Sequence, residues 1–405
     1  MQIRIPNFAL VIIVGADTTI KTDFINGHFN NTEIVDCSDL ALIEERLKNK
    51  QFTVVNQVDL QPKPFQILAR LSKKYHCKLV AIVLNLGENE SRNCANEAFH
   101  LISKQTHQIQ NFVKNHKHNG IRTIYELTST EEIETASLFK YKLWCNREHE
   151  TGAFDIIGDV HGCGEELEQL LIKLDYEVET GENFPFGYQV IPPSGRKAFF
   201  VGDLTDRGPD SPKVLRIVMS MIKQKKALCV RGNHDDKVYR MLLGKKVKLV
   251  HGLAETAEQL DKEPIEFVEQ VRDFLGKLVN HYVVDNGNLV VAHAGLREDM
   301  HGRASGKVNS FCLYGDTTGK KDEFGLVERL NWATDYRGKA FVVYGHTPQA
   351  EAVWENNTMN IDTGCVFGGW LTALRYPERE IVQVRAIEEY YEYRKPLYKN
   401  ESMSK

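Results

Sequence analysis

The chain has 405 residues, 42% hydrophobic and 26% charged, with a formal net charge of −4. This length predicts a folded protein of two or three domains, and the charge excludes an overall basic surface of the kind that binds nucleic acid. The sequence has no apolar run long enough to span a bilayer, and residues 1–15 indicate a strand rather than a signal sequence.

Eight cysteines are scattered along the chain without a C-x-x-C pair, at positions 37, 77, 94, 145, 163, 229, 312 and 365. In a chain of this length, such a distribution favours free thiols in a reducing compartment over a disulfide framework. We therefore expect a cytoplasmic protein.

The amino-terminal part alternates between apolar strands and amphipathic helices. The predicted strands are 8–15, 52–58, 78–86 and 121–128, and the predicted helices between them are 41–50 and 64–76. Strand–helix alternation predicts a doubly wound parallel sheet. Residues 131–152 are expected to form an exit helix and a linker, so the first domain is placed at 1–150.

The first buried strand leads into the segment VGADTTIKT at 14–22. A phosphate-binding loop has the pattern G-x-x-x-x-G-K-[ST], which Gly15, Lys21 and Thr22 fit as candidate phosphate contacts. Ile20 stands where the second glycine is needed, and a β-branched side chain obstructs the close approach of backbone to phosphate. The segment is therefore interpreted as a working kinase loop, a residual phosphate binder, or a strand–turn–helix without catalysis, with the last favoured.

From residue 153 onward, short apolar strands each end in a polar cluster. These segments are 154–162, 198–208, 228–236, 289–295, 340–348 and 358–364. Side chains that follow strand ends in layered α/β folds tend to form the active site. Residues 236–281 are expected to be helical and to interrupt the strand series. The second domain is placed at 151–390, and 391–405 is expected to be a surface tail.

The strand-end clusters supply carboxylate, imidazole and amide ligands. The candidate metal ligands are Asp159, His161, Asp203, Asn233, His293 and His346. Such mixed ligands suit Mn²⁺ or Fe²⁺, with zinc as an alternative. A carboxylate such as Asp203 can bridge two ions, and two ions can hold both the attacking and the leaving oxygen of a phosphoryl displacement.

Further polar residues stand beside these ligands. Arg207 and Arg231 are candidates for bidentate phosphate binding. His234 is the candidate acid for the leaving oxygen, with Asp206 orienting its imidazole. Asp362 is a further candidate, although an Asp-Thr-Gly sequence also makes an ordinary turn.

The ordered motifs GDVHG, GDLTDRG, RGNHD, HAG and GHTP resemble the calcineurin-like metallophosphoesterases of the phosphoprotein-phosphatase type. The resemblance covers residues 154 to about 385. It implies an αββα sandwich, the same six metal ligands, phosphate binding by Arg207, acid catalysis by His234 and a role for Asp362. It also implies two divalent ions, expected to be manganese, with iron, zinc, nickel or cobalt as alternatives.

The ending IDTGCVFGGWLTALRYPE resembles the bacterial branch that contains dinucleoside tetraphosphatases and RNA-repair phosphatases. The stretches HGLAETAEQL and DEFGLVERLNWATDYRGKAFVVYGHTP are similar to bacterial polynucleotide kinase-phosphatase. This resemblance implies that the first domain is a degenerate P-loop kinase-like domain and that an adenylyltransferase domain is absent. It also implies that the substrates are RNA 2′-phosphate or 2′,3′-cyclic phosphate ends in RNA repair, with an RNA-repair partner.

The sequence therefore predicts a metal-dependent phosphoesterase without kinase activity. The alternatives within enzymes are a dinucleoside tetraphosphatase and a serine/threonine protein phosphatase. The alternative of another class is a nucleotide- or RNA-binding scaffold. A scaffold would not require every metal-ligand position to be filled, and here each position is filled.

Overall fold

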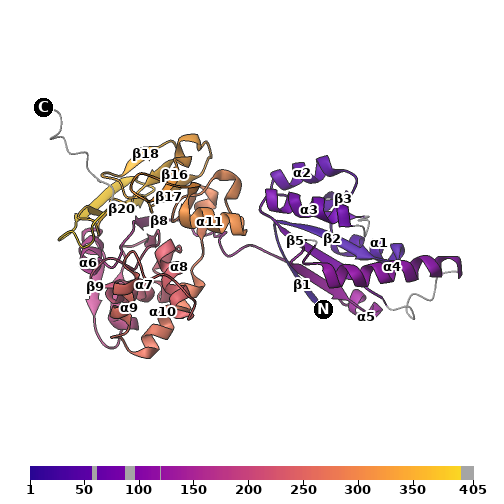
Figure 1. The fold of residues 1–405 in the computed structure, drawn as a ribbon, viewed down its shortest axis with the longest axis horizontal. Coiled ribbons are helices and arrows are strands. Elements are labelled where there is room, and N and C mark those ends of the chain that lie inside the picture. The colour runs from indigo at the N-terminus through magenta and orange to yellow at the C-terminus, as the bar shows by residue number, and fades with distance from the viewer. Residues whose placement is uncertain (57–61, 87–95, 119, 394–405) are drawn as a thin grey trace. The chain divides into compact units, whose positions relative to one another are not determined.

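A parallel sheet forms the centre of the first unit, which comprises Met1–Leu143 and Arg303–Gly306. The structure is a computed structural model that describes residues 1–56, 62–86, 96–118 and 120–393. The strand order is β3-β4-β2-β5-β6 and all pairs are parallel (Figure 1). The strands are β2 (Ala9–Gly15), β3 (Ile34–Asp36), β4 (Thr53–Asn56), β5 (Lys78–Leu84) and β6 (Thr123–Leu127).

Helices cover both faces of this sheet. They are α1 (Thr18–His28), α2 (Leu40–Lys48), α3 (Pro62–Lys74), α4 (Asn96–Asn115) and α5 (Thr130–Glu134). Residues of α2, α3 and α4 form one hydrophobic core with the side chains of Leu10 and Ile12. Residues of α1 and α5 form the other core with Val11 and Ile13. Side chains alternate between the faces of a strand, so β2 is apolar at every position from Ala9 to Val14. The predicted mixed α/β fold is confirmed.

The exit helix expected, with a linker, over 131–152 is limited to the start of that range. Helix α5 has only five residues, and the chain then forms strand β7 (Ser137–Tyr141), which pairs in parallel with β1 (Gln2–Pro6). Ile3 and Ile5 of β1 are fully buried, and Leu138 of β7 packs against the same core. The strand pairing and this burial explain why the chain leaves the helix so early.

The second unit, Trp144–Gly302 and Lys307–Lys405, contains two five-stranded sheets. The first has the order β12-β11-β8-β20-β21, with β8 (Ala153–Ile157), β11 (Arg196–Phe200), β12 (Ala227–Cys229), β20 (Trp370–Tyr376) and β21 (Glu380–Arg385). The second has the order β13-β14-β17-β19-β18, with β13 (His281–Val284), β14 (Leu289–Ala292), β17 (Phe341–Tyr344), β18 (Val353–Glu355) and β19 (Thr358–Asn360).

The two sheets pack face to face. One buried cluster joins Phe154 and Phe199 of the first sheet to Val291 and Val343 of the second. Helices α6 (Gly164–Lys173) and α7 (Ser211–Lys223) cover the outer face of the first sheet, and α11 (Gly306–Tyr314) covers that of the second. The result is a four-layer αββα arrangement (Figure 1). The smaller antiparallel pairs are β9 (Glu177–Thr180) with β10 (Tyr188–Ile191) and β15 (Asp316–Lys321) with β16 (Val327–Leu330).

All six strands predicted for this part are present, as β8, β11, β12, β14, β17 and β19. Neighbours β8, β11 and β12 are parallel, as are β14, β17 and β19. Parallel strands bring their carboxyl ends to one edge of a sheet. The polar clusters that follow these strands are therefore brought together.

The helical prediction for 236–281 is confirmed by α8 (Asn233–Leu242), α9 (Leu253–Leu260) and α10 (Ile265–Lys277), which are separated by irregular chain at 243–252. Residues 391–393, the described part of the predicted surface tail, are half-buried or exposed, and aromatic side chains near this end pack on the second unit. The Tyr390 hydroxyl donates to Glu166 at 2.9 Å, and the Tyr393 ring packs on Phe367 at 4.6 Å. The rest of the predicted tail, 394–405, lies outside the described residues.

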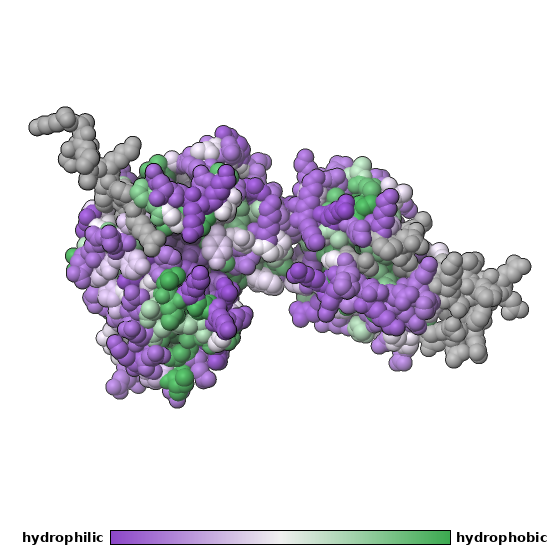
Figure 2. Space-filling model, viewed as in Figure 1, coloured by the Kyte–Doolittle hydropathy of each residue, from purple (hydrophilic) through white to green (hydrophobic). Residues whose placement is uncertain are grey.

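Hydropathy varies over the surface of the second unit. Figure 2 shows an apolar strip among polar residues over the α8–α10 region. Leu249 is 56% exposed and Val250 is 46% exposed, and both belong to the irregular chain between α8 and α9. In the part of the chain that the structure describes, no helix combines the length and the apolar character needed to cross a membrane.

Candidate metal centre

The loops that carry the site are sterically tight. A Cβ atom on Gly232 would lie 2.1 Å from the backbone nitrogen of Asp203, and one on Gly345 would lie 2.0 Å from Asp159 Oδ1. Asp203 and His346 have positive φ angles of 48° and 72°. Left-handed backbone at residues other than glycine is costly and concentrates at functional sites. These glycines permit the close approach, and the strained residues aim their side chains inward.

Four of the six predicted ligands, His161, Asp203, His293 and His346, fall in two groups of side chains that share Asp203. Of the other two, Asn233 Oδ1 lies 3.1 Å from His293 Nε2, and Asp159 Oδ2 accepts from the backbone nitrogen of His346 at 3.1 Å. One group holds His161, Asp203 and His234, and the other holds Asp203, His293 and His346, with ligand atoms within 4.8 Å of one another. Asp203 Oδ2 lies 3.5 Å from His161 Nε2 and 3.3 Å from His293 Nε2. Asp203 is therefore the carboxylate that both groups share, and its bridging of two ions stays a prediction.

Backbone carbonyls fix the imidazole orientations. Nδ1 of His161 donates to the carbonyl oxygen of Thr205 at 2.8 Å, and Nδ1 of His293 donates to that of Val201 at 3.1 Å. Each ring then presents the lone pair of Nε2 to the site, the tautomer that a metal requires. His293 Nε2 lies 3.1 Å from Asn233 Oδ1 and 3.3 Å from Asp203 Oδ2. The lone pairs of these three atoms therefore point toward one small region.

Buried acceptors without partners test whether the site fits cations. Asp159 Oδ1 and His346 Nε2 are buried, and neither atom has a hydrogen-bond partner among the residues that the structure describes. Burial, together with the charges of Asp362 and Asp203, raises the pKa of the Asp159 carboxyl well above its usual range. Burial and the Arg207 guanidinium lower the pKa of His161 to about 3, which keeps this imidazole neutral. Burying several carboxylates and unpaired imidazole nitrogens costs free energy, and bound divalent cations offset this cost. The residues therefore fit a dinuclear metal centre.

His234, Asp206 and Arg207 form a chain of contacts beside the ligands. Asp206 Oδ2 accepts a hydrogen bond from His234 Nδ1 at 2.6 Å. The Arg207 guanidinium donates to His234 Nε2 at 2.9 Å and to His161 Nε2 at 2.7 Å. Arg207 Nε is buried without a partner, and the guanidinium lies over the Phe367 ring at 5.1 Å. The predicted acid, its orienting carboxylate and one phosphate-binding arginine are therefore adjacent.

The other two predicted site residues differ in position. Asp362 is buried, accepts a hydrogen bond from the backbone of Gly364, and is close enough to Asp159 to raise its pKa. Arg231 instead reaches helix α10, where its guanidinium donates to the carbonyl oxygens of Leu275 (2.7 Å) and Gly276 (3.2 Å). This contact gives Arg231 a structural role at the end of α10, distinct from the phosphate contact expected for it.

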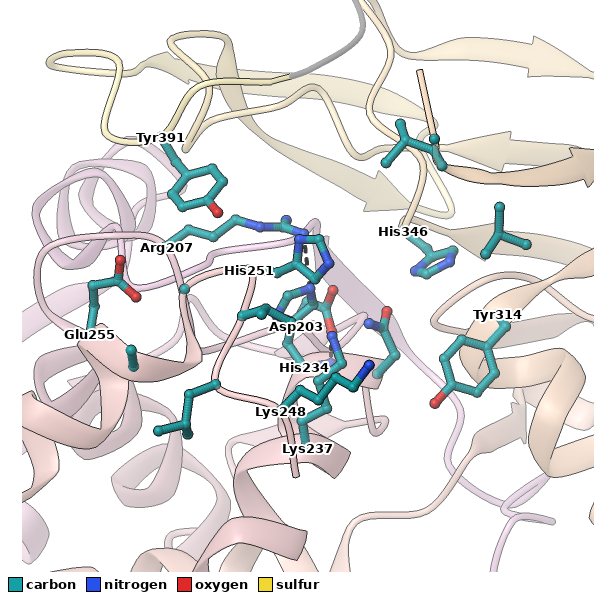
Figure 3. Close-up of a pocket in the computed structure, with 18 of the residues that line it drawn as sticks. Asp203, Arg207, His234, Lys237, Lys248, His251, Glu255, Tyr314, His346 and Tyr391 are labelled. Atoms are coloured by element: carbon teal, nitrogen blue, oxygen red, sulfur yellow. Dashed lines mark hydrogen bonds between the residues drawn. The ribbon is translucent and has the colours of Figure 1, made fainter. Parts of the chain in front are cut away.

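A cavity of about 770 Å³ opens above the ligands. Asp203, His234, His346 and Arg207 line it (Figure 3), and so does Asn233. Its walls carry residues that the sequence analysis did not single out, namely Lys237, Lys248, Lys321, Arg329, Tyr314 and Tyr391. They stand on α8, the 243–252 segment, the β15–β16 pair, α11 and the segment after β21, so no single motif marks them.

The phosphate-loop candidates of the first unit have a different environment. Asp17 caps helix α1, and its Oδ1 accepts hydrogen bonds from the backbone nitrogens of Thr19 (2.8 Å) and Ile20 (3.0 Å). The hydroxyl of Thr22 donates to the carbonyl oxygen of Thr18. Burial lowers the pKa of Lys21, and the hollow beside Asp17 and Ile20 measures only about 10 Å³, space for one water.

Comparisons with known proteins match the second unit. The model of the calcineurin-like phosphoesterase family matches residues 153–350. An asymmetrical bis(5′-nucleosyl)-tetraphosphatase of Anoxybacillus flavithermus is 49% identical over 235 residues, which are 57% of this chain and 93% of that protein. Proteins of the same name from Geobacillus sp. and Halalkalibacterium halodurans are each 46% identical, again over 57% of this chain and 93% of the relative.

Proposed function

Because the chain belongs to the calcineurin-like phosphoesterase family, we propose that its second unit is a dinuclear metal-dependent hydrolase of dinucleoside tetraphosphates. The observation that carries the proposal is the cationic cavity above the predicted ligands. Arg207, Lys237, Lys248, Lys321 and Arg329 all line it, and such a concentration of positive charge suits a polyphosphate better than a single phosphate group. The relatives that are 46–49% identical carry the name of this activity.

The predicted site residues of the second unit, apart from Arg231, each have a proposed task. Two divalent ions, proposed to be manganese, would be held by Asp159, His161, Asp203, Asn233, His293 and His346. When bound, such ions polarise the phosphoryl group and lower the pKa of water. Arg207 binds phosphate oxygens, His234 donates a proton to the leaving oxygen, and Asp206 holds the His234 ring in the required tautomer. Asp362 lies beside Asp159 and supports that carboxylate.

Hydrolysis of RNA ends is retained as a second substrate hypothesis, resting on the motif resemblance alone. RNA 2′-phosphate and 2′,3′-cyclic phosphate ends place a ribose between successive backbone phosphates, so they bring fewer negative charges into the cavity than four directly linked phosphates. A phosphorylated serine or threonine brings a single phosphate group, which can contact only some of the cavity cations. We therefore place the tetraphosphate first and keep an RNA-repair partner as a part of the second hypothesis only.

The first unit is proposed to be a P-loop kinase-like fold without kinase activity. The Asp17 carboxylate occupies the α1 backbone amides that would otherwise bind a phosphate. A negative charge at that position also repels phosphate. Binding of nucleotide or RNA by this unit as a scaffold is the alternative, and Lys21 would be its phosphate contact.

A substrate panel with manganese tests the proposal. The substrates are diadenosine tetraphosphate, RNA with a 2′-phosphate or 2′,3′-cyclic phosphate end, a phosphopeptide and p-nitrophenyl phosphate. We expect kcat/KM to be highest for diadenosine tetraphosphate. A higher value for an RNA end would replace the proposed substrate, and no hydrolysis of any member would contradict a hydrolase.

A further inference from the structure

Two cavities meet at the metal centre. The smaller one, about 220 Å³, has Ala294, Trp332, Tyr344, Thr347 and Gln349 in its walls. Arg329 and His346 line both cavities. Because His346 belongs to one of the two ligand groups, both cavities border a phosphate held beside this residue. A substrate with groups on both sides of the reacting phosphorus can fill both.

The larger cavity has the chemistry of a polyphosphate site with an apolar margin. Lys237, Lys248 and Arg329 line it, and none of their three side chains makes an ion pair or a hydrogen bond with another of the described residues. In Figure 3, Lys248 extends toward the centre of the cavity, opposite Tyr314. The exposed side chains of Leu249 and Val250 line the same cavity. Unpaired cations beside apolar side chains match several phosphates followed by a nucleoside.

The smaller cavity has the chemistry of a nucleoside site. The rings of Trp332 and Tyr344 line it with centroids 5.1 Å apart. The side-chain amide of Gln349 is exposed there and has no partner among the described residues. An aromatic wall and a free amide suit one base. Arg329 is the sole side chain with a formal positive charge in this lining, so the smaller cavity suits fewer phosphates.

His234 distinguishes the two sides. It lines the larger cavity and is absent from the lining of the smaller one. A residue that protonates the leaving oxygen must lie on the side of the leaving group. The leaving group therefore occupies the larger cavity.

On the premise of the proposed function, we propose that the two cavities orient a dinucleoside tetraphosphate for attack at one end. One nucleoside, with its adjacent phosphate, binds in the smaller cavity, and the other three phosphates and their nucleoside bind among Lys237, Lys248 and Arg329. The water oxygen bonds to the phosphorus beside the smaller cavity, and the bridging P–O bond to the triphosphate breaks. The electron pair leaves with the nucleoside triphosphate, which receives a proton, and a nucleoside monophosphate remains.

Hydrolysis of diadenosine tetraphosphate in ¹⁸O-labelled water tests the orientation. Mass spectrometry of the products is expected to find the label in the monophosphate, because the attacked phosphorus stays with the smaller cavity. Label in the triphosphate would show attack on the far side of the cleaved bond and would overturn the orientation. This outcome leaves the proposed function intact, whereas failure to hydrolyse the substrate at all overturns both.

Two surface variants test the cavities separately. Lys248→Ala is expected to lower kcat/KM for diadenosine tetraphosphate, relative to that for p-nitrophenyl phosphate, by about tenfold, because a contact between charged groups is lost. Gln349→Ala is expected to raise KM for diadenosine tetraphosphate roughly two- to tenfold, relative to adenosine 5′-tetraphosphate, which has one nucleoside. The matched controls are the exposed neighbours Lys246→Ala and Glu351→Ala. Ratios that equal those of the controls would overturn the assigned cavities.

Discussion

Asp206 Oδ2 lies 2.6 Å from His234 Nδ1 in the interior of the second unit, where both side chains are buried. Because Nδ1 donates to this carboxylate, Nε2 of the ring accepts from Arg207 and faces the cavity. Burial and the Arg207 guanidinium lower the pKa of His234 well below its usual range, so the imidazole is neutral in this arrangement. An anionic phosphate beside it would raise that pKa and favour a protonated His234.

The first prediction concerns this pair. His234→Ala is expected to lower kcat by about 10²–10⁴-fold for substrates with a poor leaving group. The loss is expected to be smaller for p-nitrophenyl phosphate, whose leaving group needs less protonation. Asp206→Asn removes the carboxylate that accepts from Nδ1, and we expect a loss in the same direction. Equal losses for good and poor leaving groups would contradict the role of His234 as an acid.

The two predicted arginines are expected to respond differently to substitution. Arg231 donates to the carbonyl oxygens of Leu275 and Gly276 in the last turn of α10, where carbonyls lack the full set of helical partners; the Leu275 carbonyl also accepts from the Leu278 backbone nitrogen at 3.4 Å. Arg231→Ala is expected to lower the free energy of unfolding by about 1–3 kcal/mol. Arg207→Ala is expected to lower kcat/KM with a much smaller change in unfolding. Urea unfolding followed by circular dichroism, with kinetics on both variants, checks this, and the reverse pattern would contradict it.

Asp17 is expected to prevent nucleotide binding by the first unit. Its carboxylate accepts from the Thr19 and Ile20 amides, and the adjacent hollow has room for about one water. We expect no transfer of the γ-phosphate of ATP to a 5′-hydroxyl oligonucleotide and no heat of ATP binding. Transfer that is lost in Lys21→Ala would contradict this account of the loop.

The rate of cysteine alkylation at pH 8 tests the burial and the raised pKa of two thiols, Cys77 and Cys145. Burial raises the pKa of Cys77 to about 12 and that of Cys145 to about 11. Both are therefore protonated at pH 8, and the thiolate is the reactive form. Iodoacetamide is expected to modify them slowly in the folded protein and quickly in urea, with the partly exposed Cys37 reacting earlier. Rapid modification of Cys77 in the folded protein would contradict its burial.

The elements that could be predicted from the sequence are those with strong local signals. Continuous apolar runs predicted the strands β2, β5 and β8. The motifs GDVHG and GDLTDRG marked turns in which a glycine lies close to the backbone of a neighbouring loop. The β7 strand was missed because its side chains alternate weakly, and its pairing with β1 joins residues about 135 positions apart. The direction of the Arg231 side chain was also missed, since its partners are carbonyls of a helix more than 40 residues further on.

The residues of the cavity walls could not be predicted from local sequence patterns either. Lys248, Arg329 and Gln349 have no motif around them and acquire a shared environment only through the folded layers. The capping role of Asp17 was also not predicted, because the phosphate-binding pattern allows any residue at this position. A helix-capping carboxylate at the position of an expected phosphate is the physical signal that would have indicated it.

Metal titration of chelator-treated protein tests the central claim most directly. EDTA-treated and dialysed protein is titrated with Mn²⁺ while hydrolysis of diadenosine tetraphosphate and bound metal are measured together. We expect no activity without metal, full activity at two ions per chain, and no recovery in Asp203→Asn, which lacks the carboxylate shared by both ligand groups. Metal-free protein that hydrolyses the substrate, or an Asp203→Asn variant as active as the unmodified chain, would contradict a dinuclear metal-dependent hydrolase.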